Sequence, residues 1–458
     1  MSVKFAVVGH PNKGKSTIVS NLAMDDSIAI SKVPGTTTKS KEYTLKVDGK
    51  SVYTLIDTPG FQRPRQVLAY LESKNAPAHK RLDVVKEFIE EFKDNPKFKD
   101  DIELLKPLVE GAGVLYIVDA SKPYTLEYEN DMKILSYLGR PSMAILNFID
   151  SKSDYSKEWK SVLTHYFKLI KRFNPMLADI NEYIDLLEAI SHLNEEWREP
   201  LKKSIWAFKE LFKQRVKKSS KSITDMIFDI ALYKKTRSFS EDERVKKEFI
   251  KEYKKDIKKF EKRAFFEILK VWEHKSIEVD INDIALDDIE LFSKEAAEIF
   301  GLSQKDFILY SAATGATIGA GIDLAFLGHT LFAGAGLGAI LGGVGAYFGY
   351  EKAFDIKIKG FSLGKKYLEL GPLEDVNLLF ILLQRAISYT KDIATLSYAK
   401  RGKVSFELKR SEILTPQEKK KFFKLHKSLI NEKNLDTIKI EYQELLEKVI
   451  NRVLREKD

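Results

Sequence analysis

The stretch VKFAVVGHPNKGKST, residues Val3 to Thr17, is the most informative part of the N-terminal sequence. It reads as a short apolar strand, a loop bounded by glycines, and the start of a helix. The loop, Gly9 to Ser16, matches the pattern G-x-x-x-x-G-K-[ST] without a gap. In that pattern backbone N–H groups surround the α- and β-phosphates of a nucleotide, and the helix N-terminus adds the positive end of its dipole. The stretch therefore predicts a phosphate-binding loop.

Individual side chains of this loop have separate expected roles. Lys15 would reach the β- and γ-phosphates, and the hydroxyl of Ser16 would bind Mg²⁺. We assign the other residues of the loop and the start of the helix to nucleotide binding as well: Gly9, His10, Pro11, Asn12, Lys13, Gly14 and Thr17.

The composition narrows the class of protein. A length of 458 residues predicts two to four domains, and 44% hydrophobic with 31% charged residues is typical of a folded chain. The net charge of +9 favours anionic partners, such as a nucleotide, RNA or an acidic membrane leaflet, without choosing between them. Because there is no cysteine, disulfides, zinc thiolate sites and cysteine nucleophiles are excluded. The first strand begins almost at Met1, so we expect no signal peptide and a cytoplasmic nucleotide-binding domain.

Two further motifs follow the phosphate-binding loop. A polar segment ends in PGTTT, Pro34 to Thr38, and two strands with alternating polarity are predicted at Glu42 to Val47 and Ser51 to Ile56. The second strand runs directly into DTPG, Asp57 to Gly60. An aspartate at the end of such a strand can hold Mg²⁺ through water, and the N–H of the glycine can contact the γ-phosphate. The three motifs together are far more specific than any one alone.

These motifs resemble the G1, G2 and G3 motifs of a translation-factor-class GTPase of the TrmE–Era–EngA type. The resemblance implies an α/β P-loop NTPase G domain, with a mostly parallel sheet and helices on both sides. It implies GTP or GDP, Mg²⁺ and K⁺ as cofactors. A threonine of the G2 loop would complete the Mg²⁺ shell with Ser16 and Asp57, which places Thr37 there, with Thr36 and Thr38 as the alternatives.

The resemblance also suggests which residues support hydrolysis. In several relatives the asparagine of the phosphate-binding loop, here Asn12, helps to hold a potassium ion. Lys15, Asn12 and Thr37 form the expected catalytic set. Phe61 follows DTPG, where many small GTPases carry a glutamine that orients water. A phenyl ring cannot orient water by hydrogen bonding, so we expect slow intrinsic hydrolysis that needs K⁺, another group, dimerisation or a partner.

The predicted base-reading motif is also unusual. Asn147-Phe148-Ile149-Asp150 stands where N-K-x-D belongs. The carboxylate of Asp150 can accept from guanine N1–H and N2–H₂, whereas adenine has an acceptor at N1 and no N2 amine. Asn147 can brace the loop, and the ring of Phe148 is a candidate to stack on the base in place of the lysine stem. The motif predicts guanine over adenine.

The G domain is expected to cover residues 1–195, with an insert at about 61–112. Helices are predicted in the insert at Val67 to Leu71, Val84 to Phe92 and Ile102 to Val109. We interpret the insert as an elaborated switch II without chemistry of its own. Strands are predicted after it at Gly113 to Asp119, Ser142 to Asn147 and Phe167 to Phe173, with a helix at Asn130 to Leu138.

The C-terminal half is predicted to be mainly α-helical. Residues 196–305 form a basic helical region, with breaks expected at Ser220 to Ser222 and Ser238 to Asp242. Aromatic residues recur among its lysines between Val245 and Lys270. They fit an RNA-binding surface or the core stripe of a helix, and their spacing of three to four favours the core. Residues 351–458 form a C-terminal helical region, with its helices at 377–398, 417–429 and 438–454.

Residues 306–350 form a Gly/Ala-rich apolar stretch that predicts a helical hairpin. Its small residues at every fourth position let helix backbones approach closely, as in membrane helix packing. Its second arm, Leu331 to Tyr350, is long enough to span a bilayer core of about 30 Å. The alternative is a glycine zipper buried inside a helical domain; we favour membrane association.

The order of these regions resembles a bacterial GTPase family whose C-terminal region is a domain of unknown function. The resemblance implies a membrane-associated GTPase, peripheral or hairpin-anchored at the inner membrane. The leading hypothesis is a Mg²⁺-dependent GTPase switch that acts with a membrane or membrane-protein partner and forms a nucleotide-dependent homodimer. The alternatives are a ribosome- or RNA-binding assembly GTPase, which we favour less, and a nucleotide-gated scaffold that does not hydrolyse.

Overall fold

The computed structural model describes residues 3–23, 39–47, 50–149, 153–176, 178, 180–274, 277–279, 357–360, 366–373, 376–397, 402–404, 413–431 and 434–456. The predictions for Thr36 to Thr38, Asp150 and the apolar stretch 306–350 lie outside these residues. The chain divides into two compact units. The first is Met1–Gln214 with Glu273–Ile277 and Thr395–Gly402, and the second is Arg215–Trp272, Glu278–Ala394 and Lys403–Asp458. The predicted division into four regions stays a prediction.

The first unit is built on a six-stranded sheet with the order β2-β3-β1-β4-β5-β6. Only β2 runs antiparallel to its neighbour; the other pairs are parallel. The strands are β1 (Val3–Val8), β2 (Lys41–Val47), β3 (Lys50–Asp57), β4 (Gly113–Asp119), β5 (Ser142–Asn147) and β6 (Leu169–Arg172). The sheet confirms the predicted mostly parallel α/β fold, and it places the residues after β1, β3 and β5 at one edge, where ligands of such sheets bind.

Helices cover both faces of this sheet, as its apolar strands require. Along β4, Leu115 and Ile117 face one layer, and Val114, Tyr116 and Val118 face the other. The first layer contains α1 (Lys15–Leu22), α7 (Ile180–Ser191) and the N-terminal part of α8 (Glu195–Leu232). The second contains α2 (Pro64–Ser73), α3 (Arg81–Phe92), α4 (Lys99–Val109), α5 (Tyr128–Leu138) and α6 (Ser156–Leu163).

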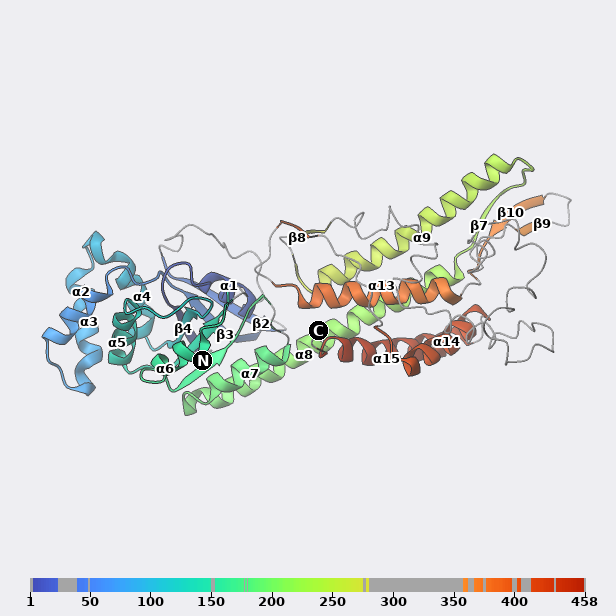
Figure 1. Cartoon of the computed structure of the whole chain (residues 1–458). Helices are drawn as coiled ribbons and strands as arrows, with labels where there is room; N and C mark the ends of the chain where they lie inside the picture. The colour runs from blue at the N-terminus through green and yellow to red at the C-terminus, as the bar shows by residue number, and fades with distance from the viewer. Residues whose placement is uncertain are drawn as a thin grey trace. The chain divides into compact units, whose positions relative to one another are not determined.

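The insert after DTPG folds as the three predicted helices, α2, α3 and α4. Short 3₁₀ turns at Ala78–Lys80 and Pro96–Phe98 separate them. The helices α2 and α3 pack on α5, and α3 packs on α4, so the insert extends the second layer of the G domain (Figure 1). The insert is therefore part of the core of the first unit and not a free loop.

The second unit is mainly helical, which confirms the predicted class of the C-terminal half. Its helices, together with the C-terminal part of α8, are α9 (Glu243–Val271), α13 (Val376–Thr395), α14 (Pro416–Ile430) and α15 (Leu435–Val453). The strands β7 (Lys235–Ser238), β10 (Lys366–Leu370) and β9 (Lys357–Gly360) form a small antiparallel sheet in that order. Two further strands, β8 (Ile277–Val279) and β11 (Gly402–Val404), pair with each other, and the first residue of each is assigned to the first unit. Within the described part of the chain, no helix is long and apolar enough to cross a membrane.

The predicted helix break at Ser220 to Ser222 is wrong, because α8 runs without interruption through it. Ser219 and Ser220 are fully buried, and the indole N–H of Trp272 donates to Ser219 Oγ over 3.2 Å. Serine weakens an isolated helix, but here tertiary packing outweighs that preference. The second predicted break is confirmed, since β7 ends at Ser238 and α9 begins at Glu243.

The aromatic stripe of α9 belongs to the core of the second unit. Phe249, Tyr253, Ile257 and Phe265 are each at most 1% exposed. The ring of Phe265 stacks on Tyr389 of α13, with centroids 4.2 Å apart. The rings of Phe249, Tyr253 and Phe265 are therefore not available to stack on RNA, as the three-to-four spacing indicates, whereas Phe260 is half-buried.

The buried His426 makes the second unit sensitive to acid. Its Nε2 lies 2.9 Å from the hydroxyl of Tyr442, and burial lowers its pKa to about 3. Between pH 6.5 and 3 the unfolded chain binds this proton and the folded chain does not, so stability falls as the pH falls. We expect about 2 kcal/mol less stability at pH 5 than at pH 7 from this group. Urea unfolding of wild type and His426→Gln checks this: the difference between them should shrink as the pH falls, and a constant difference contradicts it.

Candidate nucleotide-binding site

The phosphate-binding loop lies between β1 and α1, and it is folded around the ammonium group of Lys15. The Nζ atom of Lys15 donates to the carbonyl oxygens of Gly9 and His10, each over 2.9 Å. Burial lowers the pKa of Lys15 to about 8, against the opposing charges of Asp57 and Asp131. A phosphate group at the loop would supply the negative charge that this buried lysine favours.

The loop backbone depends on residues that accept positive φ angles. Asn12 has a φ of 60° and Gly14 a φ of 85°, and asparagine and glycine are the residues that tolerate this region best. A Cβ atom on Gly14 would lie 2.3 Å from Nδ2 of Asn147. Backbone geometry therefore favours asparagine at position 12 and glycine at position 14, whatever contacts these residues make with a ligand.

Asn147, at the end of β5, lies against the loop. Its Nδ2 donates to the carbonyl oxygen of Lys13 over 3.0 Å, and the side chain is buried. The structure thus places it where the sequence expects a residue that braces the loop. Its role toward guanine stays a prediction.

Two of the three predicted magnesium ligands meet at this site. Ser16 Oγ donates to Asp57 Oδ2 over 2.9 Å. A hydroxyl and a carboxylate are hard oxygen donors, and Mg²⁺ at nucleotide sites takes few protein ligands and completes its shell with phosphates and water. The pair therefore fits Mg²⁺, while no cluster of three or more His, Cys, Asp or Glu side chains that could hold a metal occurs in the described ranges. The third predicted ligand, Thr37, lies outside those ranges.

The DTPG segment lies directly beside the phosphate-binding loop. The hydroxyl of Thr58 donates to the carbonyl oxygen of Val7 over 2.7 Å. A Cβ atom on Gly60 would lie 2.9 Å from both the carbonyl oxygen of Gly9 and Cδ of Pro11. Only glycine lets the backbone come this close, which is the approach that an N–H group needs to reach a γ-phosphate.

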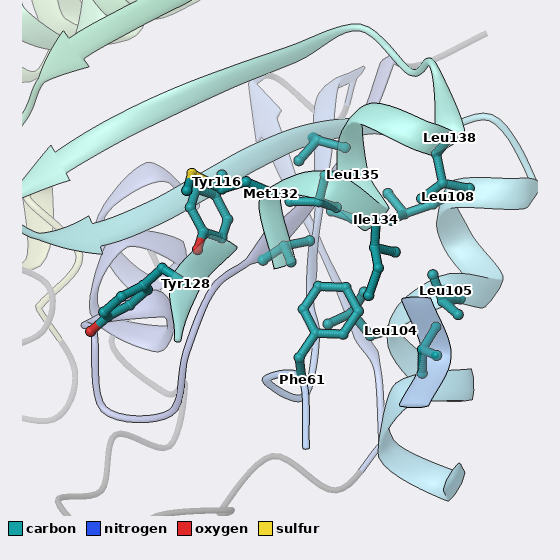
Figure 2. Packing of buried hydrophobic residues seen from close by; sticks show 14 of the residues in the cluster. Phe61, Leu104, Leu105, Leu108, Tyr116, Tyr128, Met132, Ile134, Leu135 and Leu138 are labelled. Atoms are coloured by element: carbon teal, nitrogen blue, oxygen red, sulfur yellow. The ribbon is translucent and has the colours of Figure 1, made fainter. Parts of the chain in front are cut away.

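Both unusual phenylalanines are core residues. Phe61 is 3% exposed, and its ring lies among side chains of α4 and α5, including Leu104 and Ile134 (Figure 2). Phe148 is also buried in this cluster, and the guanidinium of Arg172 covers its ring at 4.0 Å. The expectation that Phe148 stacks on the base is therefore wrong, because packing and Arg172 already occupy the ring.

Two buried aspartates that the motifs do not identify support the site. Asp131 of α5 is fully buried and pairs with His10 of the loop, with 3.1 Å between Oδ2 and Nε2. Burial raises the pKa of Asp131, although His10 opposes this. The ring of His10 also packs on Tyr128, with centroids 4.2 Å apart. A carboxylate on the apolar face of a predicted helix is the only sequence signal for Asp131.

Asp119, at the end of β4, holds the loop that leads to Asp150, the residue predicted to read the base. Its Oδ1 accepts from the backbone N–H groups of Ser121, over 3.2 Å, and Ile149, over 3.4 Å. Ile149 directly precedes Asp150 in the chain. An aspartate that ends a buried strand is the signal that could identify this residue.

The motifs and their order on a mostly parallel sheet define a P-loop GTPase domain of the translation-factor class. The chain belongs to the family described as a domain of unknown function, DUF3482, whose model matches residues 160–451. A second family model, described as 50S ribosome-binding GTPase, matches residues 4–148. The resemblance stated from the motifs is thereby confirmed.

Curated proteins similar to this chain are GTPases by name. The tRNA modification GTPase MnmE of Pseudothermotoga lettingae is 26% identical over 250 residues, which cover 49% of this chain and 48% of that protein. The GTPase Der of Herminiimonas arsenicoxydans is 42% identical over 71 residues, 16% of each chain. A crystal structure of Era with MgGDPNP and nucleotides 1506-1542 of 16S ribosomal RNA is 19% identical, with a TM-score of 0.28 over 38% of this chain and 51% of that one. The chain spans less than half the length of the curated relatives named here.

Proposed function

We propose that this chain is a Mg²⁺-dependent GTPase that works as a nucleotide-controlled switch. The observation that carries the proposal is the joint placement of Lys15, the Ser16–Asp57 pair and Gly60 at the phosphate-binding loop. Lys15 would neutralise charge on the β- and γ-phosphates, Ser16 and Thr37 would hold Mg²⁺, and Asp57 would hold it through water. Bound Mg²⁺ would supply further charge neutralisation on the phosphates.

Intrinsic hydrolysis is expected to be slow. The residue after DTPG, Phe61, is packed in the core and has no polar atom in its side chain, so it cannot orient the attacking water. We propose that a potassium ion at Asn12, or a partner or second copy of the chain, supplies this help. The conformations of Thr36 to Thr38 and of the segment after Gly60 would differ between the GTP-bound and GDP-bound states.

Titration with labelled GTP and ATP tests the proposal. With Mg²⁺ present we expect GTP to bind at least about tenfold more tightly than ATP, because a carboxylate at Asp150 would pair with the guanine N–H groups. Turnover should be faster in K⁺ than in Na⁺. Equal affinity for ATP removes the guanine assignment, and equal rates in the two salts remove the special role of Asn12.

The variant Asp150→Asn sharpens the guanine assignment. The amide turns one acceptor into a donor, so it should weaken GTP binding and strengthen binding of xanthosine triphosphate, which carries a carbonyl at C2. Binding of ATP is the control and should change little. If the variant binds GTP as the wild type does, Asp150 does not read the base.

We further propose that the apolar stretch 306–350 couples the switch to a membrane. Its support is sequence alone: length, glycine spacing and few charges. Flotation of the whole protein with vesicles containing anionic lipid tests this, in GTP and in GDP. A protein that stays wholly unbound in both states contradicts membrane coupling. The proposed homodimer is tested separately by measuring the molecular mass in solution with GTP and with GDP. A mass that does not change with the nucleotide contradicts the nucleotide-dependent homodimer.

An RNA-binding assembly GTPase is the second candidate, because residues 4–148 match the model described as 50S ribosome-binding GTPase. It predicts RNA binding that weakens steeply with salt. Its nucleic-acid surface would be the basic helices of the C-terminal half, because Phe249, Tyr253 and Phe265 of α9 are buried in the core. A chain that binds GTP but never turns it over would instead be a nucleotide-gated scaffold.

A further inference from the structure

We propose that Asp101, in the insert helix α4, is a positioning residue that holds the segment after Gly60 in place for GTP hydrolysis. The inference rests on the proposed function, because it concerns the regulation of that site. It also revises the interpretation of the insert, which now has a defined task at the nucleotide.

The carboxylate of Asp101 binds the backbone of the DTPG segment where that segment leaves the phosphate-binding loop. Its Oδ1 accepts from the N–H groups of Gln62, over 3.0 Å, and Arg63, over 3.2 Å. Gln62 is two residues beyond Gly60, which itself lies against Gly9 and Pro11. Movement of the segment relative to α4 must therefore break these two bonds or bend the chain between residues 60 and 62.

The residue between Gly60 and Gln62 is anchored to the same helix. The ring of Phe61 is buried in the cluster that contains Leu104 and Leu105 of α4 (Figure 2). Three consecutive residues are thus tied to α4, one by its side chain and two by their backbone. A helix that shifts by a few ångströms would carry the segment with it.

The same helix also contacts the end of the segment that carries the G2 threonines. Ser40 Oγ donates to the carbonyl oxygen of Glu103 over 2.7 Å. Ser40 lies three residues after Thr37 in the chain. Helix α4 is therefore bonded to the residues that follow both nucleotide-sensing motifs, which is the position required of an element that links the two.

A carboxylate at this place is costly for the fold. Asp101 is fully buried, and burial raises its pKa to about 6, although the N–H groups of Arg63 and Gln62 oppose this. The charged groups that act on it, Asp100 of α4 and Asp131 of α5, are acids and raise the pKa further. A charge kept at a site that disfavours it is typical of functional positions.

The charge has a use, because hydrogen bonds to a carboxylate are about twice as strong as those to a neutral acceptor. Protonation below about pH 6, or replacement by asparagine, would keep the shape and weaken both bonds. The effect on the fold has the opposite sign. The folded pKa is raised, so the folded chain holds this proton more tightly than the unfolded chain below about pH 6, and loss of the charge stabilises the fold.

The test compares Asp101→Asn with Asp100→Asn, in the whole protein. Both variants remove one acid from the first turn of α4, but no hydrogen bond joins Asp100 to the described residues 62 and 63. For Asp101→Asn we expect kcat for GTP to fall about tenfold, a KM for GTP within about threefold of wild type, and an unfolding midpoint in urea at pH 7 equal to or above that of wild type. For Asp100→Asn we expect no change in kcat. In wild type, kcat should fall as the pH drops through 6, and Asp101→Asn should lack this step.

Hydrogen exchange gives a readout that does not depend on turnover. In Asp101→Ala the amides of Gln62 and Arg63 should exchange at least about tenfold faster than in wild type, and in Asp100→Asn they should not. If Asp101 has a purely structural role, its replacement by asparagine lowers stability and kcat and raises KM together, and that result overturns the proposal. So does an unchanged kcat in Asp101→Asn when the wild type is active. A wild type that does not hydrolyse GTP at all refutes the proposed function, and this inference with it.

Discussion

Replacing Lys15 by alanine is expected to lower GTP turnover by at least about 100-fold, which corresponds to about 2.7 kcal/mol of lost transition-state stabilisation. The ammonium group is buried and held by the carbonyl oxygens of Gly9 and His10, so it is fixed in place before the nucleotide arrives. A charge fixed in a site of low polarity stabilises the developing phosphate charge far more than a mobile one in water. Binding of GTP should weaken as well, because the interaction is present in the ground state.

The matched control is Lys157→Ala, which removes an exposed lysine from α6 of the same unit. It should leave turnover and affinity unchanged. Turnover is measured as phosphate release and affinity with labelled GTP, and urea unfolding excludes loss of fold as the cause. A Lys15→Ala variant within threefold of the wild-type rate would contradict the assignment of the phosphate-binding loop.

The second large effect is expected in the helical unit, at the buried ion pair between α9 and α13. Arg385 Nε donates to Glu261 Oε1 over 2.7 Å, and Nη2 donates to Oε2 over 3.2 Å. The two side chains are 2% and 4% exposed. Glu261→Ala would leave the guanidinium buried without its carboxylate, which costs about 3–5 kcal/mol. Urea unfolding, followed by circular dichroism, measures this.

Two variants separate the buried charge from helix propensity. Glu267→Ala, on the same helix, removes an exposed pair with Lys270 and should cost less than about 1 kcal/mol. The double variant Glu261→Leu with Arg385→Met replaces both charges by apolar groups and should recover most of the loss. If the double variant is as unstable as Glu261→Ala, packing and not the unpaired charge is responsible.

The phosphate-binding loop can be identified from the sequence because it depends on residue types at fixed, short spacing. Gly9, Gly14, Lys15 and Ser16 must occur at fixed spacing for the backbone to surround a phosphate, so the spacing alone identifies them. The same holds for the DTPG segment and for the helices of the insert, whose apolar periodicity appears in the structure as α2, α3 and α4. The stripe of α9 was predictable for the same reason, since a spacing of three to four places its rings on one face.

Other features depend on what a residue meets far along the chain. Read locally, Ser220 to Ser222 predict a break, yet close packing and the bond from Trp272 to Ser219 keep α8 intact. Phe148 occupies the place of a base-covering lysine, but Arg172 from the next strand covers its ring. Asp101 and Asp131 look like ordinary helix acids until the fold buries one beside Gln62 and the other beside His10.

A P-loop GTPase domain followed by a helical half is predictable from motif spacing and apolar periodicity alone, because both patterns depend on local backbone geometry. The packing of the insert in the core, and its bonds to Ser40 and to the backbone after DTPG, follow only from the folded arrangement. Burial and hydrogen bonding depend on residues that the fold brings together from distant positions in the chain. The pKa of a carboxylate such as Asp101 therefore depends on its surroundings in the folded protein.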